Sequence, residues 1–511
     1  MKNFRKPILL TALALLFLSG YSQTSKDFPK EVNLVKMTDA GVAIVGTDDA
    51  LYGLDNTGKD LWKNEKLRKV EPEKVEVLKG SELVFVSDKS ILSRNRVLNV
   101  LDGREYANTG IKGENLFGAR VIHATNQLWV LSQPKIIDVW DIESNAYLYR
   151  LEATPAKISF DESASYTYTF SGMQPLTHTS STTAILHLGL GHLGEYDLTT
   201  GKPKWMFDWT AYKPKADKGD KASNPSSRYA VMKLDGGTLY FPFRNMLIAV
   251  DAKSGESKWD VKANAPGKVL DMYVTDYGIL VLTGSGIQLI DKSTGEEVWK
   301  KPLKIKEAIS SLLLKDGEDI YAISKTSLLK VDIANQKATA LTEKIKFKNK
   351  DEISGIEVFE EKIVLSTPQN IVGIDKQSGS ILHSVYYEAP GTGLATIAAN
   401  VVLATVAMAA TANSYNVNSI SGSQTYFQYT PAVMSSGGSE TLDNGKITYI
   451  STKFKDSDAK GFGVARVDKT SGETLNKIVI GDRNPIYDVD ETRGMIFFKS
   501  DNKTVSIQSM D

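Results

Sequence analysis

The segment Leu289-Ile290-Asp291-Lys292-Ser293-Thr294-Gly295-Glu296-Glu297-Val298-Trp299 shows how this chain is built. An alternating apolar run ends at Asp291, and Gly295 offers the positive φ that a tight hairpin requires. Trp299 then follows at a fixed distance on the returning run. The segment therefore predicts a strand, a tight turn and a second strand.

Copies of this segment recur along the chain and divide it into units. Four copies keep the aspartate, the glycine and the tryptophan: Asp55, Gly58 and Trp62; Asp197, Gly201 and Trp205; Asp251, Gly255 and Trp259; and Asp291, Gly295 and Trp299. Two weaker copies keep the frame but lose the aromatic residue, with His383 after Asp375 and Asn476 after Asp468. Degenerate copies begin at Asp102, at Asp141, which precedes Tyr149, and at Asp332. A period of about 40 to 50 residues indicates a repeated architecture such as a propeller.

The motif has a mechanical explanation. An aspartate can bind the amides of the turn with its side chain, serine and threonine do so more weakly, and glycine takes the left-handed backbone position. The aromatic residue can then lie flat against the neighbouring unit and bury roughly 150 to 250 Å². We interpret the twelve residues of the four intact copies as structural docking residues. Units without the aromatic residue are expected to have softer interfaces.

Each unit also contains strand-like runs before the motif. Val269 to Val274 and Ile279 to Leu282 precede Gln288 to Asp291 in this way. Four short antiparallel strands per period are typical of a β-propeller blade.

The pattern Asp-x-x-Thr/Ser-Gly-x-x-x-Trp resembles the tryptophan-docking motif of the PQQ-like (quinoprotein-type) β-propeller repeat family, and the chain is closest in character to its BamB-like branch. The resemblance implies one all-β propeller of four-stranded antiparallel blades. Eight blades are usual in the family. We favour eight blades for this chain as well, while nine motif-bearing units and a three-stranded C-terminal remnant at 486–508 leave nine or ten open. The segment Gln23 to Lys30 is the candidate for closing that remnant, which would leave no free sheet edge at the seam.

The N-terminus has the pattern of a secretory signal peptide. Lys2, Arg5 and Lys6 precede the apolar run from Ile8 to Leu18, which is about half the length needed to span a bilayer. We expect residues 1–22 to be removed and residues 23–511 to form the propeller of an exported, periplasmic or cell-envelope protein. Position 21 is a tyrosine and not the cysteine that lipid attachment requires, so the sequence as written does not predict a lipoprotein.

Two insertions interrupt the period, at about 211–228 and 389–445. The first is polar and rich in lysine and predicts a solvated loop. Within the second, Thr392 to Ala412 carries no charge. This stretch could form two packed strands or a projecting helix or hairpin that contacts a partner or a membrane, and short apolar runs do not decide between them. We favour the packed alternative, and peripheral membrane association through 392–412 stays open.

Composition limits the chemistry. The chain has 61 basic and 61 acidic residues and no cysteine, which argues against nucleic acid as a partner and excludes disulfides, thiolate metal sites and covalently attached haem. His178, His187 and His192 match no metal-ligand spacing, and we interpret them as ordinary strand and turn residues. Asp456-x-Asp458 and Asp488-x-Asp490 begin like calcium loops but depart from the pattern, so both are interpreted as turns.

The resemblance implies two kinds of function. Quinoprotein dehydrogenases of the family hold PQQ and calcium and oxidise alcohols or sugars, whereas BamB-like members bind partner proteins through loops on one face. None of the family's cofactor ligands or catalytic carboxylates can be placed on residues of this chain. We therefore expect a monomeric, non-catalytic scaffold without a cofactor that binds envelope proteins, with outer-membrane protein assembly as a candidate process; a periplasmic PQQ- and calcium-dependent dehydrogenase is the alternative. An apolar lining of the ring would favour the scaffold, and carboxylates, asparagines and arginines around a flat aromatic would favour the cofactor.

Overall fold

The structure is a computed structural model that describes most of residues 23–510. The stretches that it leaves undescribed are 1–22, 88–94, 109–115, 117, 134–135, 153–156, 161–163, 168–175, 188–191, 209–231, 244–245, 260–262, 266–268, 284–285, 306–312, 325–326, 352, 354, 391–440, 457–458 and 511. Among the described residues, no helix has the length and apolar character needed to cross a membrane. The predicted signal peptide and nearly all of the two insertions lie outside the described residues.

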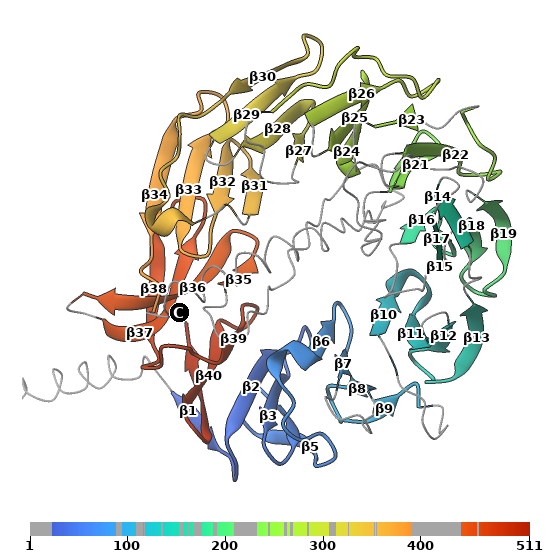
Figure 1. Ribbon diagram of the computed structural model, residues 1–511. Helices are drawn as coiled ribbons and strands as arrows, with labels where there is room; N and C mark the ends of the chain where they lie inside the picture. The colour runs from blue at the N-terminus through green and yellow to red at the C-terminus, as the bar shows by residue number, and fades with distance from the viewer. Residues whose placement is uncertain are drawn as a thin grey trace, which may run out of the picture.

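Ten antiparallel sheets follow one another around a ring (Figure 1). Nine of these blades have four strands, and blade 6 has three. An all-β propeller with blades of this kind is confirmed. The number of blades is ten, one of the counts that the motif left open, and not the eight that is usual in the family.

Blades 1 to 3 come first in the chain. Blade 1 contains β2 (Val32–Met37), β3 (Ala43–Thr47), β4 (Leu51–Leu54) and β5 (Asp60–Asn64). Blade 2 contains β6 (Val75–Leu78), β7 (Leu83–Val86), β8 (Arg96–Asn99) and β9 (Glu105–Tyr106). Blade 3 contains β10 (Gly118–Ile122), β11 (Gln127–Gln133), β12 (Ile136–Asp141) and β13 (Tyr147–Glu152). Two short 3-10 turns, η1 (Pro72–Lys74) and η2 (His123–Thr125), lie in this part of the ring.

Blades 4 to 6 contain the part of the chain with the clearest motif copies. A separate hairpin of β14 (Lys157–Phe160) and β15 (Ala164–Thr167) precedes blade 4, which contains β16 (Leu176–His178), β17 (Thr183–His187), β18 (His192–Asp197) and β19 (Pro203–Asp208). Blade 5 contains β20 (Lys233–Asp235), β21 (Thr238–Phe243), β22 (Met246–Asp251) and β23 (Ala263–Asn264). Blade 6 contains β24 (Val269–Thr275), β25 (Gly278–Thr283) and β26 (Gly286–Ile290).

Blades 7 to 10 complete the ring. Blade 7 contains β27 (Leu313–Asp316), β28 (Asp319–Ser324), β29 (Ser327–Asp332) and β30 (Lys337–Ala340), and the 3-10 turn η4 (Lys348–Lys350) follows. Blade 8 contains β31 (Gly355–Phe359), β32 (Lys362–Ser366), β33 (Asn370–Asp375) and β34 (Ile381–Tyr386). Blade 9 contains β35 (Thr441–Asn444), β36 (Ile447–Lys455), β37 (Lys460–Asp468) and β38 (Thr474–Val479). Blade 10 contains β39 (Tyr487–Asp490), β40 (Met495–Asp501), β41 (Thr504–Ser509) and β1 (Thr24–Asp27).

Blade 10 closes the ring with strands from both ends of the chain. The N-terminal strand β1 pairs antiparallel with β41, from Thr24 opposite Ile507 to Asp27 opposite Thr504. Phe28, only 4% exposed, follows β1 and meets the ring of Tyr52 in blade 1 edge to face at 5.0 Å. The predicted closure by Gln23 to Lys30 is confirmed.

The first strand of each blade lies toward the middle of the ring and the fourth strand toward the outside (Figure 1). The hydrophobic core is not central: it consists of ten clusters of buried residues, one between each pair of neighbouring blades. Packing between blades therefore holds the ring together.

The antiparallel order of the strands gives the ring two different faces. The turns between strands one and two and between strands three and four lie on one side, which we call the motif face because it carries turns such as 291–295. The turns between strands two and three and the crossovers to the next blade, such as 65–74, lie on the crossover face. Both predicted insertions follow a fourth strand, β19 or β34, so the chain enters them from the crossover face.

Candidate functional site

The aspartate of each motif holds its own turn. The Asp291 carboxylate accepts backbone hydrogen bonds from Ser293 and Thr294, both at 2.8 Å, and Gly295 N donates to Asp291 O at 3.0 Å. Gly295 has φ +76°, the left-handed conformation that the sequence predicts. Asp55, Asp197 and Asp251 bind their turns in the same way.

These hydrogen bonds stabilise the ionised form of the carboxylates. The bond from the Ser293 hydroxyl, followed by the two turn amides, lowers the pKa of Asp291 to about 2. Two backbone amides and then Lys258 lower the pKa of Asp251 to about 2. Each carboxylate is therefore already occupied as an acceptor within its own turn.

In three of the four intact copies the tryptophan lies against the motif glycine of the next blade; the fourth, Trp299, precedes a blade with Gln336 in place of that glycine. A Cβ atom at Gly255 would lie 2.5 Å from Cε3 of Trp205, and one at Gly295 would lie 2.8 Å from Cδ2 of Trp259. Trp205 Nε1 donates to Ala252 O at 3.1 Å, and Trp259 Nε1 donates to Lys292 O at 3.0 Å. Trp62 packs against Gly103 in the same manner. The motif glycine thus serves two purposes, a positive φ and a flat surface for the preceding blade.

Two copies that the sequence ranked as weak or degenerate also dock. Tyr149 lies on Gly201, and its hydroxyl donates to Leu198 O at 2.5 Å. His383 lies against Gly472, and its Nε2 is 3.0 Å from Lys469 O. Both acceptors directly follow the motif aspartate of the next blade, as Ala252 and Lys292 do. The description of the His383 copy as having lost the aromatic docking residue was wrong, because the imidazole ring takes the same place. The degenerate copy at Asp141 docks through its Tyr149.

The segment around Trp299 differs from the expected hairpin in its second half. Only isolated bridges join it to β26, between Ile290 and Glu297 and between Ile287 and Leu303. The residues between these bridges include Pro302, which has no amide hydrogen to donate. The Gln288 side chain instead donates to Trp299 O at 2.9 Å. The turn prediction is confirmed, but the returning strand is interrupted.

Around the middle of the ring, charged residues of the first strands contact the first strand of the neighbouring blade. The Asp488 carboxylate of blade 10 accepts Met37 N of blade 1 at 2.7 Å. The Asp271 carboxylate of blade 6 accepts Leu313 N of blade 7 at 3.4 Å. Burial raises the pKa of both carboxyls to about 6 and outweighs these hydrogen bonds and the nearby lysines, Lys36 and Lys233.

Glu76 extends this arrangement to blades 1, 2 and 3. Its carboxyl is accessible to solvent, yet the surrounding protein raises its pKa, and Lys36 and Arg120 on the adjacent first strands oppose that shift. Asp488, Lys36, Glu76 and Arg120 thus alternate in sign over four consecutive blades. Sequence reasoning missed this lining, although Asp488, Glu76 and Arg120 each lie two residues before the end of a first strand.

The lining of the ring fits neither of the two patterns that would separate a scaffold from a cofactor site. It is not apolar, and its described carboxylates bind backbone amides and lie beside basic side chains of neighbouring blades. Among the described residues, no group of three histidines or acids could hold a metal ion. His178 lies on β16, while His187 and His192 are placed only by their backbone on β17 and β18.

One of the two calcium-like segments is not a turn. Asp488 and Asp490 lie within β39, and the turn follows at 491–494. Asp490 pairs with Arg493 at 2.7 Å. The other segment lies between β36 and β37 as predicted, and its Asp456 pairs with Lys477 at 2.8 Å.

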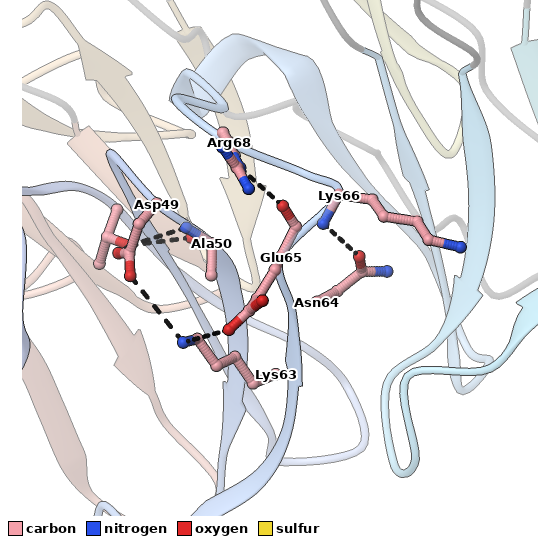
Figure 2. A network of polar contacts seen from close by, with 8 residues as sticks. Asp49, Ala50, Lys63, Asn64, Glu65, Lys66 and Arg68 are labelled. Carbon is pink, nitrogen blue, oxygen red and sulfur yellow. Dashed lines mark hydrogen bonds and ion pairs between the residues drawn. The ribbon is translucent and has the colours of Figure 1, made fainter.

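The crossover face is held in place by polar contacts of its own, shown for blade 1 in Figure 2. Lys63 Nζ lies 2.8 Å from Glu65 and 3.9 Å from Asp49, which belongs to the turn between β3 and β4. Arg68 Nε donates to Glu65 O at 2.8 Å. The turn and the crossover are thereby joined, while the Lys66 side chain points away from the network (Figure 2).

Residues 175–337 match the model of a family described as outer membrane protein assembly factor BamB. This match runs from blade 4 to the start of β30, the last strand of blade 7, and confirms the resemblance to PQQ-like repeats. No significant match is found among curated proteins.

Three solved structures illustrate the similarity to known propellers. BamB from Moraxella catarrhalis is 12% identical with a TM-score of 0.37, and the alignment covers 68% of this chain and 97% of that one. The computationally designed Ika8 protein is 11% identical with a TM-score of 0.36 and coverages of 71% and 98%. The dihydro-heme d1 dehydrogenase NirN is 12% identical with a TM-score of 0.38 and coverages of 79% and 72%. Similarity at this level says nothing about what this chain binds or does.

Proposed function

We propose that this chain, a ten-bladed propeller with PQQ-like repeats, is a non-catalytic scaffold of the cell envelope that binds other proteins through its crossover face. Outer-membrane protein assembly is the process that we assign to it, on the basis of the family match at residues 175–337.

One observation carries the proposal: the residues that recur in this chain are used to build the ring. The motif aspartates bind their own turns, and Trp62, Trp205 and Trp259 donate to carbonyl groups of the next blade. The residues of the repeated motif therefore hold the ring together. Sequence variation falls in the loops, which a scaffold uses for recognition.

The two faces differ in what they offer a partner. The motif face consists of short turns fixed by the same hydrogen bonds in blade after blade. The crossover face carries the longer connections and the entry points of both insertions, after Asp208 and after Pro390. Loops of variable length on a rigid frame are the usual location of protein recognition sites.

Site-specific photo-crosslinking in the native host tests this assignment. A photoreactive residue at the exposed Lys66 samples the crossover face, and one at the exposed Lys253 samples the motif face as a matched control. We expect discrete adducts with other envelope proteins from position 66 and none from position 253. Equal labelling from both faces, or only monomer from position 66, would contradict the proposal.

A second measurement separates the scaffold from the dehydrogenase alternative. The purified chain is incubated with PQQ and calcium, and dye-linked oxidation of alcohols and sugars is followed together with the PQQ absorbance. The scaffold assignment predicts no oxidation and no spectral change. Saturable turnover would overturn it even if crosslinked partners were found.

A further inference from the structure

The fourth strands of the blades form the outer rim of the ring (Figure 1). The outer edge of such a strand offers backbone groups to any extended chain, and proteins usually protect it with charged residues, proline or a very short strand. Among the described fourth strands, those of blades 2 and 5 have only two residues, and those of blades 1, 3, 4, 7, 9 and 10 carry at least one charged residue. The exception is β34 of blade 8, which has the sequence Ile-Leu-His-Ser-Val-Tyr and contains neither a charged residue nor a proline.

The backbone of β34 is open on its outer side. Within the described part of the chain, β34 pairs only with β33. Tyr387 N, directly after the strand, donates to Gln369 O on the β33 side at 2.9 Å. Alternate residues of an antiparallel edge strand direct their backbone groups to opposite sides. Ser384 and Tyr386 therefore direct their N–H and C=O groups away from the sheet.

Apolar side chains are exposed along the same edge. Ile381 and Leu382 are 46% and 48% exposed at the start of β34. Val479, on the outer strand β38 of blade 9, is 44% exposed. It lies on the blade 8 side, because its neighbour Ile478 belongs to the cluster between blades 9 and 10. An extended chain along β34 would thus meet apolar surface as well as backbone groups.

Charged groups close to the strand already have partners in the ring. Glu388, just beyond β34, pairs with Lys455, and Lys477 of β38 pairs with Asp456 at 2.8 Å. Lys348, on the crossover before blade 8, lies over the tyrosine ring at the end of β34 at 5.1 Å from its centre. A charged segment would find no opposite charge on β34 itself, so the edge suits an uncharged one.

We propose that β34 binds an extended, uncharged segment of another protein as a fifth strand of blade 8. The outward N–H and C=O groups of Ser384 and Tyr386 supply main-chain hydrogen bonds, and Ile381, Leu382 and Val479 contact alternate apolar side chains of the segment. This inference goes beyond the scaffold function. It places a second site on the rim of the ring, and its test does not depend on partners of the crossover face.

The shape of the rim favours a flexible segment over a second copy of this chain. β34 has six residues, which corresponds to a length of about 20 Å. Two convex rims that meet along one such strand bury much less than the roughly 1,200 to 2,000 Å² of a specific protein interface. An extended segment bends around the rim and reaches the apolar side chains of both blades.

Fluorescence anisotropy with a synthetic peptide tests the proposal. The probe is the end-blocked, fluorescein-labelled peptide Ser-Thr-Val-Thr-Val-Thr-Val-Ser, added to the chain beginning at Gln23. The test variant is Ser384→Pro, which removes an outward N–H that the sheet does not use, so the edge strand tolerates it. The matched control is Met206→Pro, because Met206 also directly follows the docking ring of its blade but lies on a strand protected by Lys204 and Asp208. Ser384→Lys is a second test variant, which places a protective charge on the edge.

We expect the parent and Met206→Pro to bind the peptide equally, and both variants at position 384 to bind it about tenfold more weakly or worse. A peptide with prolines in place of its threonines has three fewer N–H groups and should not compete. No binding by the parent, or equal loss in both proline variants, would overturn the assignment. Self-association of the peptide-free parent that Ser384→Pro abolishes would also overturn it, because the occupant would then be a second copy. Melting midpoints verify that the variants fold.

Discussion

At the scale of single residues, the motif glycine is the most constrained position of the chain. Gly255 has φ +76° and lies against the indole of Trp205, so a side chain there meets both backbone strain and a steric clash. Gly237, two strands earlier in the same blade, has φ +77°, and a Cβ atom there would have no neighbour within 4 Å. Comparing substitutions at these two glycines therefore separates the loss of stability caused by a strained backbone from the loss caused by a clash with the docked indole.

We predict that Gly255→Ala destabilises the protein more than Gly237→Ala. The control substitution should cost about 1 to 2 kcal/mol from the left-handed backbone alone. The substitution at Gly255 should cost about 1 to 3 kcal/mol more, because it overpacks the contact with Trp205. The midpoints of thermal unfolding of both variants measure the difference. Equal midpoints would mean that the indole is not docked on this glycine.

Among the described docking side chains, His383 is the one whose ordinary pKa, 6.5, lies near neutral pH. Its imidazole lies between Gly373 of its own blade and Gly472 of the next. Burial lowers its pKa below the usual 6.5, more than the hydrogen bond to Lys469 O raises it. The unfolded chain therefore binds a proton at a higher pH than the folded chain does. The stabilising contribution of neutral His383 is complete above pH 6.5 and is lost as the pH falls below that value.

We predict that His383→Trp makes the stability less sensitive to acid. Trp62 occupies the equivalent place between Gly53 and Gly103, so an indole fits the docking geometry. When the pH falls from 7.5 to 5, the free energy of unfolding of the variant should rise relative to that of the parent by at most about 2 kcal/mol, since one pKa unit corresponds to about 1.4 kcal/mol. Unfolding midpoints in urea at several pH values provide the comparison. Parallel pH profiles would rule out a contribution from His383.

At the scale of elements, the first strand of a blade joins its neighbour through the carboxylate of a half-buried aspartate. Asp271 on β24 accepts Leu313 N of β27, and burial raises its pKa from 3.8 to about 6. Between these two pH values the folded chain binds a proton that the unfolded chain does not. The cost of the buried charge is therefore present above pH 6 and is relieved as the pH falls toward 3.8.

We predict that Asp271→Asn removes part of this pH dependence. The parent should gain stability relative to the variant when the pH falls from 7.5 to 5, the opposite sign to the effect of His383. Asp276→Asn, an exposed substitution in the hairpin that follows the same strand, is the control and should track the parent. Chemical unfolding at the two pH values tests the sign. If the Asp271→Asn variant gains as much stability on acidification as the parent does, the proposed role of Asp271 is refuted.

At the scale of the whole molecule, the ring is closed by a short strand from the N-terminus. Strand β1 itself is largely exposed, and Phe28 supplies the buried anchor in the cluster between blades 10 and 1. Lys26 adds an ion pair to Asp60 of blade 1 at 2.8 Å. Without this strand, β41 would be a free sheet edge at the seam of the ring.

We predict that Phe28→Ala weakens closure by about 3 to 5 kcal/mol, the usual cost of removing a buried phenylalanine. Lys30→Ala, two residues further along at an exposed position, should leave the melting midpoint unchanged. Deleting residues 23–30 should in addition expose the edge of β41 and promote self-association, which light scattering detects. A deletion variant as stable and as monomeric as the parent would show that the seam does not need the clasp.

The sequence by itself determined the repeat, the turn chemistry and the closure. The spacing of Asp291, Gly295 and Trp299 is local information, since a turn aspartate and a left-handed glycine act within a few residues. The pairing of the three strands of blade 10 with an N-terminal strand was predictable because an incomplete sheet has a free edge that needs a partner strand.

Only the tertiary structure decided the number of blades and the contacts between them. His383 looked like the loss of a docking residue in the sequence, and Tyr149 stood in a degenerate copy, but docking requires a flat ring with a hydrogen-bond donor and not indole specifically. The alternation of Asp488, Lys36, Glu76 and Arg120 joins residues that are far apart in the chain and meet only when the ring closes.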